Sequence, residues 1–395
     1  MLTKKRLENL QKKLSGRLLY DDLHKLLYAT DASVYRKIPL AVVYPKNKKD
    51  LQVLIEFATQ NKITLIPRAA GTSLAGQCVG DGIVVDVSKH FVNILAFDEL
   101  KRTITIEPGV VRDELNLFLQ PFGLFFGPNT STSNRCMIGG MVGNNSSGST
   151  SIKYGVTRDK VLQIDGLLSD GTDVSFKELT SEEFKIKTRE QSLEGKIYKS
   201  IFNELSQDEV QEEIKSQFPK PSIHRRNTGY AVDELLDSDL FGGNHSTVNV
   251  AKLLSGSEGT LVFSTAITLE LDTLQPKESV IVASHFKSIN ESLKATVLAM
   301  NHELYACELM DKVILDCTKN NREQSKNRFF IQGDPEAILM FEVSADSLDE
   351  ALDKAAALIK DLEYNNFGYH HPKITGNDIK RMFDLRKAGL GLLGN

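Results

Sequence analysis

The stretch Ile138-Gly139-Gly140-Met141-Val142-Gly143-Asn144-Asn145-Ser146-Ser147-Gly148 has a density of glycine that ordered structure seldom accepts. Glycine loses more conformational freedom on folding than any other residue, so each one needs a reason. Close packing of the backbone against a flat ligand is one reason, and a series of turns is the alternative. We predict a ligand-binding segment here that extends from Pro128 to Gly155.

A second run of small residues lies earlier in the chain, at Pro67-Arg68-Ala69-Ala70-Gly71-Thr72-Ser73-Leu74-Ala75-Gly76-Gln77. It follows the β-branched run 63–66. Small side chains let successive backbone N–H groups surround a phosphate, and the hydroxyls of Thr72 and Ser73 add donors. A flexible loop without a ligand remains the alternative. The third segment, Leu253-Leu254-Ser255-Gly256-Ser257-Glu258-Gly259-Thr260-Leu261, would by itself indicate only a hairpin corner.

In this order the three segments resemble the PCMH-type FAD-binding domain of the vanillyl-alcohol oxidase superfamily. The closest likeness is to its glycolate oxidase, D-lactate dehydrogenase and D-2-hydroxyglutarate dehydrogenase branch, and it covers about residues 39–272. The stretch His224–Tyr230 is similar to the family's segment before the third motif, although an insertion separates the two here.

The resemblance implies that the first loop holds the FAD pyrophosphate, the second segment lies along the flavin and ribityl chain, and the corner closes over the cofactor. The FAD-contacting residues that it implies are Arg68, Ala69, Ala70, Gly71, Thr72, Ser73, Leu74, Gly76, Gln77, Pro128, Thr132, Ile138, Gly139, Gly140, Gly143, Asn144, Asn145, Ser147, Gly148, Tyr154, Gly155, Glu258 and Gly259. Some members attach FAD through a histidine in the first loop. This sequence has none there, so we expect non-covalent FAD.

Near the end of the sequence, Met382–Leu390 resembles the family motif whose arginine faces the flavin and grips the substrate carboxylate. Arg386 takes that position and is our candidate catalytic residue. A guanidinium holds a carboxylate with two parallel bonds and stays charged at any working pH. The alternative is a solvated arginine on a helix surface.

The implied reaction is hydride transfer from C2 of a small 2-hydroxy acid of the D-lactate, glycolate or D-2-hydroxyglutarate type to flavin N5, which gives the 2-oxo acid. The electrons would pass to an acceptor that the sequence does not identify. Two other functions stay open. One is an FAD-dependent reductase of the enolpyruvyl type, against which Arg386 and the 253–261 corner argue. The other is a non-enzymatic module that binds a phosphorylated ligand.

The predicted fold is α+β. Residues 1–38 form an N-terminal helical segment. Residues 39–275 form the FAD-binding domain of two α/β subdomains, with a β-α-β-β unit at 40–88, antiparallel strands at 93–106 and a polar surface insertion at about 178–250. Residues 276–395 form part of a ferredoxin-like α+β substrate domain of the FAD-linked oxidase C-terminal type. Because the sequence stops among apolar residues, we expect a C-terminal truncation. An iron–sulfur cluster, implied by likeness to longer members, would lie only in the missing part.

The composition excludes several classes of protein. The formal net charge of −4 argues against a nucleic-acid partner. No apolar run is long enough for a transmembrane segment and no signal peptide is evident, so we expect a cytoplasmic location. The dispersed cysteines indicate no metal site or disulfide framework.

Two motifs of weak specificity are rejected. Gly389–Gly394 matches the G-x-G-x-x-G spacing of a dinucleotide turn, but it follows a helical stretch rather than a strand. The neighbours His370 and His371 point apart in either a helix or a strand, so we predict no metal ligation there.

Overall fold

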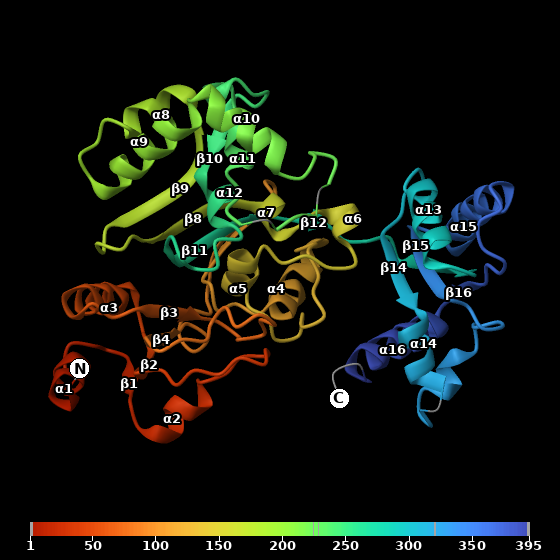
Figure 1. Ribbon diagram of the computed structural model, residues 1–395, viewed down its shortest axis with the longest axis horizontal. Helices are drawn as coiled ribbons and strands as arrows, with labels where there is room; N and C mark the ends of the chain where they lie inside the picture. The colour runs from red at the N-terminus through yellow and green to blue at the C-terminus, as the bar shows by residue number, and fades with distance from the viewer. Residues whose placement is uncertain (1–2, 224, 228, 320, 393–395) are drawn as a thin grey trace. The chain divides into compact units, whose positions relative to one another are not determined.

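The computed structural model describes residues 3–223, 225–227, 229–319 and 321–392, and the chain divides into two compact units (Figure 1). The first unit comprises Met1–Gly148 and Gly155–Thr273. The second comprises Ser149–Tyr154 and Leu274–Asn395. Both units mix helices and strands, which confirms the predicted α+β class.

The first unit begins with a four-stranded sheet of order β1-β2-β4-β3. Its strands are β1 (Arg17–Leu19), β2 (Ala41–Tyr44), β3 (Leu65–Arg68) and β4 (Ile83–Asp86). Strands β2, β4 and β3 are parallel, as expected for a β-α-β unit, and β1 is antiparallel to β2. Helix α3 (Lys48–Asn61) connects β2 to β3 and buries Leu51, Leu54, Ile55 and Ala58 at helical spacing.

Two features of this sheet differ from the sequence prediction. The N-terminal segment contains helices α1 (Lys4–Gln11) and α2 (Asp22–Leu27) but also β1, which was not predicted. Strand β3 continues through Pro67 to Arg68, beyond the β-branched run 63–66 from which a strand was predicted. Proline lacks an N–H donor, but β3 lies at the edge of the sheet and pairs on one side only, so the missing donor costs little.

The first unit also contains a six-stranded antiparallel sheet of order β10-β9-β8-β11-β6-β5 and a two-stranded sheet of β7 (Leu124–Phe125) and β12 (Asp272–Thr273). The strands of the six-stranded sheet are β5 (Ile94–Asp98), β6 (Thr103–Ile106), β8 (Val161–Leu167), β9 (Asp173–Thr180), β10 (Thr247–Asn249) and β11 (Phe263–Glu270). Strands β5 and β6 pair antiparallel as predicted. Helices α4 (Arg112–Leu119), α5 (Ile138–Asn144) and α12 (Val250–Leu254) contribute buried side chains to the core of this sheet.

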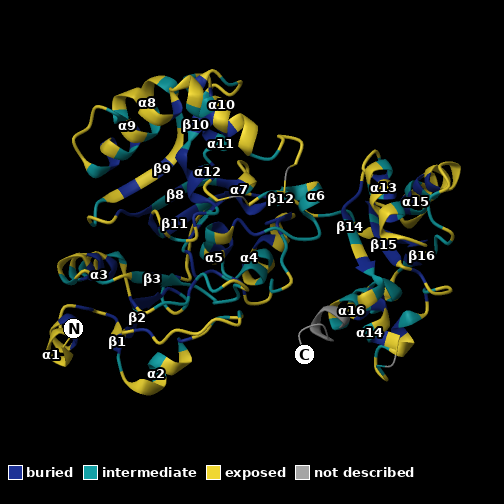
Figure 2. Cartoon of the chain, in the orientation of Figure 1, coloured by how far each residue is buried: buried dark blue, intermediate teal, exposed yellow. Residues whose placement is uncertain are grey.

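The polar segment at about 178–250 folds into helices α8 (Ser181–Lys187), α9 (Leu193–Leu205), α10 (Asp208–Gln217) and α11 (Asp233–Leu236). Their outer faces are exposed, whereas their inner faces are buried (Figure 2). Phe184, Tyr198 and Phe241 belong to the main core, and the rings of Phe184 and Tyr198 pack edge to face at 4.8 Å. The segment is therefore polar in composition but supplies aromatic side chains to the interior.

The second unit has a four-stranded antiparallel sheet of order β14-β15-β13-β16. The chain forms β13 (Glu278–Phe286), α13 (Ile289–Ala299), β14 (Ala306–Asp311), β15 (Ala337–Ala345), α15 (Leu348–Tyr364) and β16 (Lys373–Thr375). This βαββαβ order, with the first and third strands central, confirms the ferredoxin-like prediction. Helices α13 and α15 pack on one face, and α14 (Lys312–Lys319) and α16 (Asn377–Leu392) pack on the other.

Candidate cofactor site

A cavity of about 470 Å³ lies in the first unit, between the loop after β3, the region around α5 and the corner after α12. Its volume is typical of a small-molecule site. Most of the predicted FAD-contacting residues line it, from three segments far apart in the sequence: Arg68, Ala69, Ala70, Gly71, Thr72, Ser73, Leu74, Gln77, Thr132, Gly139, Gly140, Gly143, Asn144, Asn145, Ser147, Glu258 and Gly259.

The other predicted contact residues lie elsewhere. Ile138 is buried in the main core, and Gly148 packs against Asn129, where a Cβ atom would lie 1.5 Å from the carbonyl oxygen. Tyr154 belongs to the second unit, in α6 (Ser151–Tyr154), and its ring packs edge to face on Tyr305 at 6.2 Å. Gly76, Pro128 and Gly155 are also outside the cavity lining.

The glycines of the cavity wall meet different surroundings. Gly71 has φ +66°, and a Cβ atom there would lie 2.6 Å from the guanidinium of Arg68. A Cβ atom at Gly140 or Gly143 would meet its nearest atom at 3.6 or 3.7 Å, an ordinary van der Waals distance, so a side chain would fit there and would narrow the cavity that both residues line. The absence of side chains therefore keeps the backbone of α5 accessible to a ligand.

The corner joins the other two segments. The backbone N–H groups of Gly256 and Glu258 donate to the carbonyls of Val142 and Gly143, both over 2.8 Å. Glu258 has φ +55°, and its Oε1 accepts from Gln77 Nε2 over 3.4 Å. A left-handed conformation is uncommon for a residue with a Cβ atom. Its presence at Glu258 indicates that the surrounding contacts hold the turn in one conformation.

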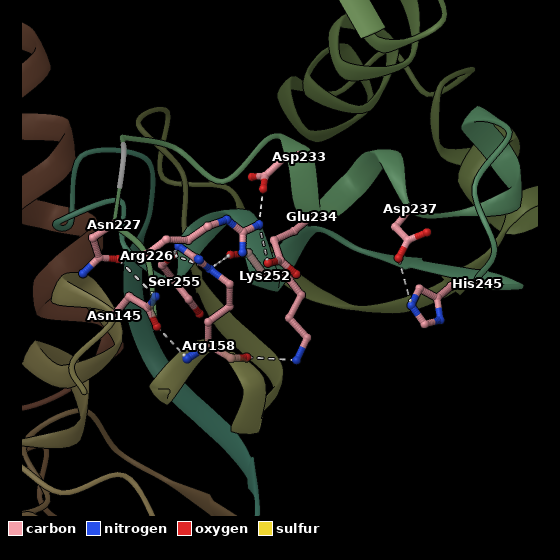
Figure 3. A network of polar contacts seen from close by, with 10 residues as sticks. All are labelled: Asn145, Arg158, Arg226, Asn227, Asp233, Glu234, Asp237, His245, Lys252 and Ser255. Atoms are coloured by element: carbon pink, nitrogen blue, oxygen red, sulfur yellow. Dashed lines mark hydrogen bonds and ion pairs between the residues drawn. The ribbon is translucent and has the colours of Figure 1, made fainter. Parts of the chain in front are cut away.

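A network of polar contacts around the buried Arg158 holds the corner 253–261 in place (Figure 3). Arg158 is 2% exposed, and its Nη2 donates to the Ser255 carbonyl over 2.8 Å. Its backbone N–H donates to Asn145 Oδ1 over 2.8 Å. Asn145 Nδ2 in turn donates to Asn227 Oδ1 over 3.1 Å. Burial lowers the pKa of Arg158 and of the neighbouring Lys252.

Arg226 is not among the residues that line the cavity, and it pairs with Asp233 and Glu234 (Figure 3). Its neighbour Arg225 lines the cavity instead, as does Asn227. His224 and Thr228, which belong to the same motif, lie outside the described residues. The cavity wall therefore carries the cations of Arg68 and Arg225 against the carboxylate of Glu258, a balance that favours an anionic ligand.

Sequence reasoning missed several residues of the cavity wall. Val87, Pro108, Val262, Phe263 and Ser264 line it from strand ends and connections. None has a local sequence signal, because only the fold brings them to the site. Cys78 and Cys136 also line it, and burial raises the pKa of both thiols.

The candidate catalytic residue, Arg386, lies on α16 in the second unit. Its guanidinium pairs with the carboxylate of Glu308 on β14, and the two side chains are 28% and 15% exposed. On the same sheet, Glu342 accepts from Ser279 Oγ over 3.2 Å, and burial raises its pKa. Residues 389–392 continue α16, and the rest of the G-x-G-x-x-G match lies outside the described residues.

Comparison with known proteins shows what part of the first unit is similar to. A family model described as an FAD binding domain matches residues 39–177. Residues 39–177 are thus similar to an FAD binding domain. The wall of the cavity is consistent with this similarity, because the matched residues include Gly140, Gly143 and Arg68, which line it.

The chain also resembles curated proteins over nearly its whole length. It is 29% identical over 384 residues to a D-2-hydroxyglutarate dehydrogenase of Pantoea ananatis, which covers 94% of this chain and 37% of the relative. It is 31% identical over 392 residues to a D-2-hydroxyglutarate dehydrogenase of Pseudomonas putida, a match that covers 96% of this chain and 38% of that relative. The glycolate oxidase subunit GlcD of Bacillus subtilis is 34% identical over 162 residues, which cover 40% of this chain and 34% of the subunit. The chain thus spans less than two fifths of the length of these dehydrogenases.

Solved structures share the fold at low sequence identity. An alkyldihydroxyacetonephosphate synthase has a TM-score of 0.66 at 13% identity and covers all of this chain and 64% of its own. The BBE-like 1 variant D396N of Physcomitrella patens has a TM-score of 0.59 at 13% identity, over 94% of this chain and 62% of that one. These matches confirm the predicted PCMH-type FAD-binding fold. Among the described helices, none is long and apolar enough to cross a membrane.

Proposed function

We propose that this chain is the FAD-binding part of an enzyme that oxidises a small 2-hydroxy acid to the 2-oxo acid. The observation that carries the proposal is the cavity of the first unit, lined by the three FAD-type segments in a chain similar over 94–96% of its length to D-2-hydroxyglutarate dehydrogenases. A hydroxy acid of the 2-hydroxyglutarate type is therefore the first substrate to test. We also propose that the enzyme is cytoplasmic and that its domains divide near residue 275.

The residues of the first unit would hold FAD without a covalent bond. In this proposal the loop 68–77 binds the pyrophosphate through backbone N–H groups and the hydroxyls of Thr72 and Ser73. Gly139, Gly140 and Gly143 admit the flat part of the ligand, and Glu258 closes the wall. When bound, FAD supplies the acceptor for a hydride from C2 of the substrate.

Arg386 would hold the substrate carboxylate. Its Nη2 pairs with Glu308 on β14, and a guanidinium can bind a carboxylate with two parallel bonds. The electrons would then pass to an acceptor that is not yet identified.

The test is a dye-reduction screen of the FAD-loaded enzyme against both enantiomers of 2-hydroxyglutarate, lactate and malate, and against glycolate. Reduction with one enantiomer of a 2-hydroxy acid is the expected result. A protein that binds FAD but reduces no dye with any of them would refute the activity, whereas one without bound flavin would refute the cofactor site.

A further inference from the structure

Three parallel strands of the first sheet end side by side at Tyr44 of β2, Asp86 of β4 and Arg68 of β3. Ligands of parallel sheets bind at this carboxyl edge, and here the cavity loop begins at Arg68. One residue of the N-terminal segment, Tyr28, contacts all three strand ends. Its hydroxyl donates to Asp86 Oδ2 over 2.5 Å and lies 2.8 Å from the hydroxyl of Tyr44. Its ring lies under the guanidinium of Arg68 at 5.0 Å.

The segment after Tyr28 then follows the cavity loop. The Thr30 carbonyl accepts from Arg68 Nη1 over 2.8 Å. The Ala32 N–H donates to the Gly71 carbonyl over 3.1 Å. The Asp31 carboxylate lies 3.8 Å from the thiol of Cys78, at the end of the loop.

The last contact is steric. A Cβ atom at Gly76 would lie 2.9 Å from the ring of Tyr35, so this ring rests directly on the backbone of the loop. Gly76 has φ +78°, which other residues rarely adopt. Residues 28–35 therefore contact the loop at its start, its middle and its end.

We propose that residues 28–35 form a brace that holds the loop 68–78 in its ligand-binding conformation, with Tyr28 as the central positioning residue. The physical reason is entropic. A loop of small residues has many conformations, and the binding of a phosphate by successive N–H groups requires one of them, so contacts that fix the loop beforehand reduce the cost of binding. The proposal rests on the FAD site proposed above and adds that residues outside the FAD binding domain set its affinity.

The test uses two variants and one control. Tyr28→Phe keeps the ring but loses the bonds to Asp86 and Tyr44. Tyr35→Ala removes the ring on Gly76 from a residue that is 58% exposed, so folding should tolerate it. Tyr364→Phe, at 85% exposure in the second unit, makes the same chemical change away from the brace.

The first readout is the rate at which FAD-loaded protein releases flavin, followed by the recovery of flavin fluorescence. Loss of a hydrogen bond to a charged group should accelerate release roughly tenfold in Tyr28→Phe. Tyr35→Ala should show a smaller increase, and Tyr364→Phe none. Release unchanged in both brace variants would overturn the proposal.

The second readout does not depend on FAD. It is the hydrogen exchange of the FAD-free brace variants, compared with that of the FAD-free wild-type protein. Exchange should become faster at the Ala32 and Val79 amides, which donate to the carbonyls of Gly71 and Gly76, and should stay the same in β11. If exchange rises equally in β11, Tyr28 serves global stability and the brace is refuted. If the wild-type chain binds no FAD, the cofactor site fails, and the exchange data still decide whether the brace exists.

Discussion

The guanidinium of Arg386 on α16 pairs with the carboxylate of Glu308 on β14 within the second unit. The pair links a helix to the sheet that it covers. It also gives Arg386 a partner before any substrate is present. Arg386 can therefore stabilise the fold, bind the substrate, or do both, and experiments can separate these roles.

The first prediction concerns Arg386→Lys. Lysine keeps the charge but loses the planar fork, so the substrate carboxylate should be held in the wrong orientation. We expect kcat/KM for the hydroxy acid to fall by roughly one to two powers of ten, from the loss of one charge-assisted bond. Steady-state kinetics and thermal unfolding of the same sample provide the measurement.

Glu308→Gln is the matched variant for this prediction, because it neutralises the partner and leaves the arginine in place. If Arg386 binds substrate, Glu308→Gln should retain far more activity than Arg386→Lys. Equal losses of activity, matched by equal losses of unfolding free energy, would assign Arg386 a structural role alone.

The second prediction is that Gly71→Glu abolishes flavin retention. The new side chain would begin 2.6 Å from the Arg68 guanidinium and would bring a negative charge to a loop expected to bind phosphate. Gly123→Glu is the control, since Gly123 has a similar φ of +69° but nothing within 4 Å of a Cβ atom. The absorbance ratio of flavin to protein after gel filtration gives the result, and a normal ratio in Gly71→Glu would remove this loop from the site.

The third prediction is that acid precipitation releases all of the flavin. The first loop has no histidine to form a covalent bond. The thiols of Cys78 and Cys136 line the cavity, but burial raises the pKa of both, and the thiolate is the nucleophilic form. Yellow colour that stayed with the washed pellet would show a covalent link and contradict the prediction.

The fourth prediction concerns the acid stability of the second unit. His285 is fully buried, with Nδ1 2.8 Å from the Ala283 carbonyl and Nε2 accepting from the Gln332 N–H. Burial, with smaller contributions from the neighbouring rings of His370 and His371, lowers the pKa of His285 from 6.5 to about 4. The native ring is therefore neutral over most of the accessible pH range.

Between pH 6.5 and 4 the unfolded chain binds a proton at His285 that the native protein does not bind. The free energy of unfolding should therefore fall as the pH falls through this window, by roughly 3 kcal/mol from this group. Urea unfolding at several pH values measures the slope. His285→Gln should reduce the slope, whereas His245→Gln, at a side chain 73% exposed, should leave it unchanged. The same slope in both variants would exclude His285 as the cause.

The local sequence predicted the parts of the site that are made of backbone. The runs of glycine and small residues at 69–77 and 138–148 have a composition that favours close approach of a ligand to the backbone, and most of their residues line the cavity. The hydrophobic periodicity at Leu51, Leu54 and Ile55 likewise identified α3. In the second unit, similar patterns predicted β13, α13, β15 and α15, whereas β14, α14 and β16 were not predicted.

Long-range polar contacts had no comparable signal. Asp50 is 1% exposed and accepts from the backbone N–H groups of Ser15, Gly16 and Lys46, which holds β1 in place. In the sequence, however, it looks like an ordinary first-turn acid of a helix. Arg158 is similar, since its partners are main-chain carbonyls almost a hundred residues away. Such contacts depend on where the fold brings a backbone group, and no pattern of side chains encodes that.

Because of the short helix α6, both units are discontinuous in the sequence. Residues 149–154 pack with the second unit, through Ile152 in its core and the Tyr154–Tyr305 ring contact, while the residues before and after them belong to the first unit. The polypeptide therefore passes from one unit to the other three times, after residues 148, 154 and 273. A single cut near residue 273 would not yield two intact modules, since residues 149–154 of the second unit would remain on the first fragment. Exchange of the second unit between relatives, by recombination or by engineering, would therefore have to transfer residues 149–154 as well.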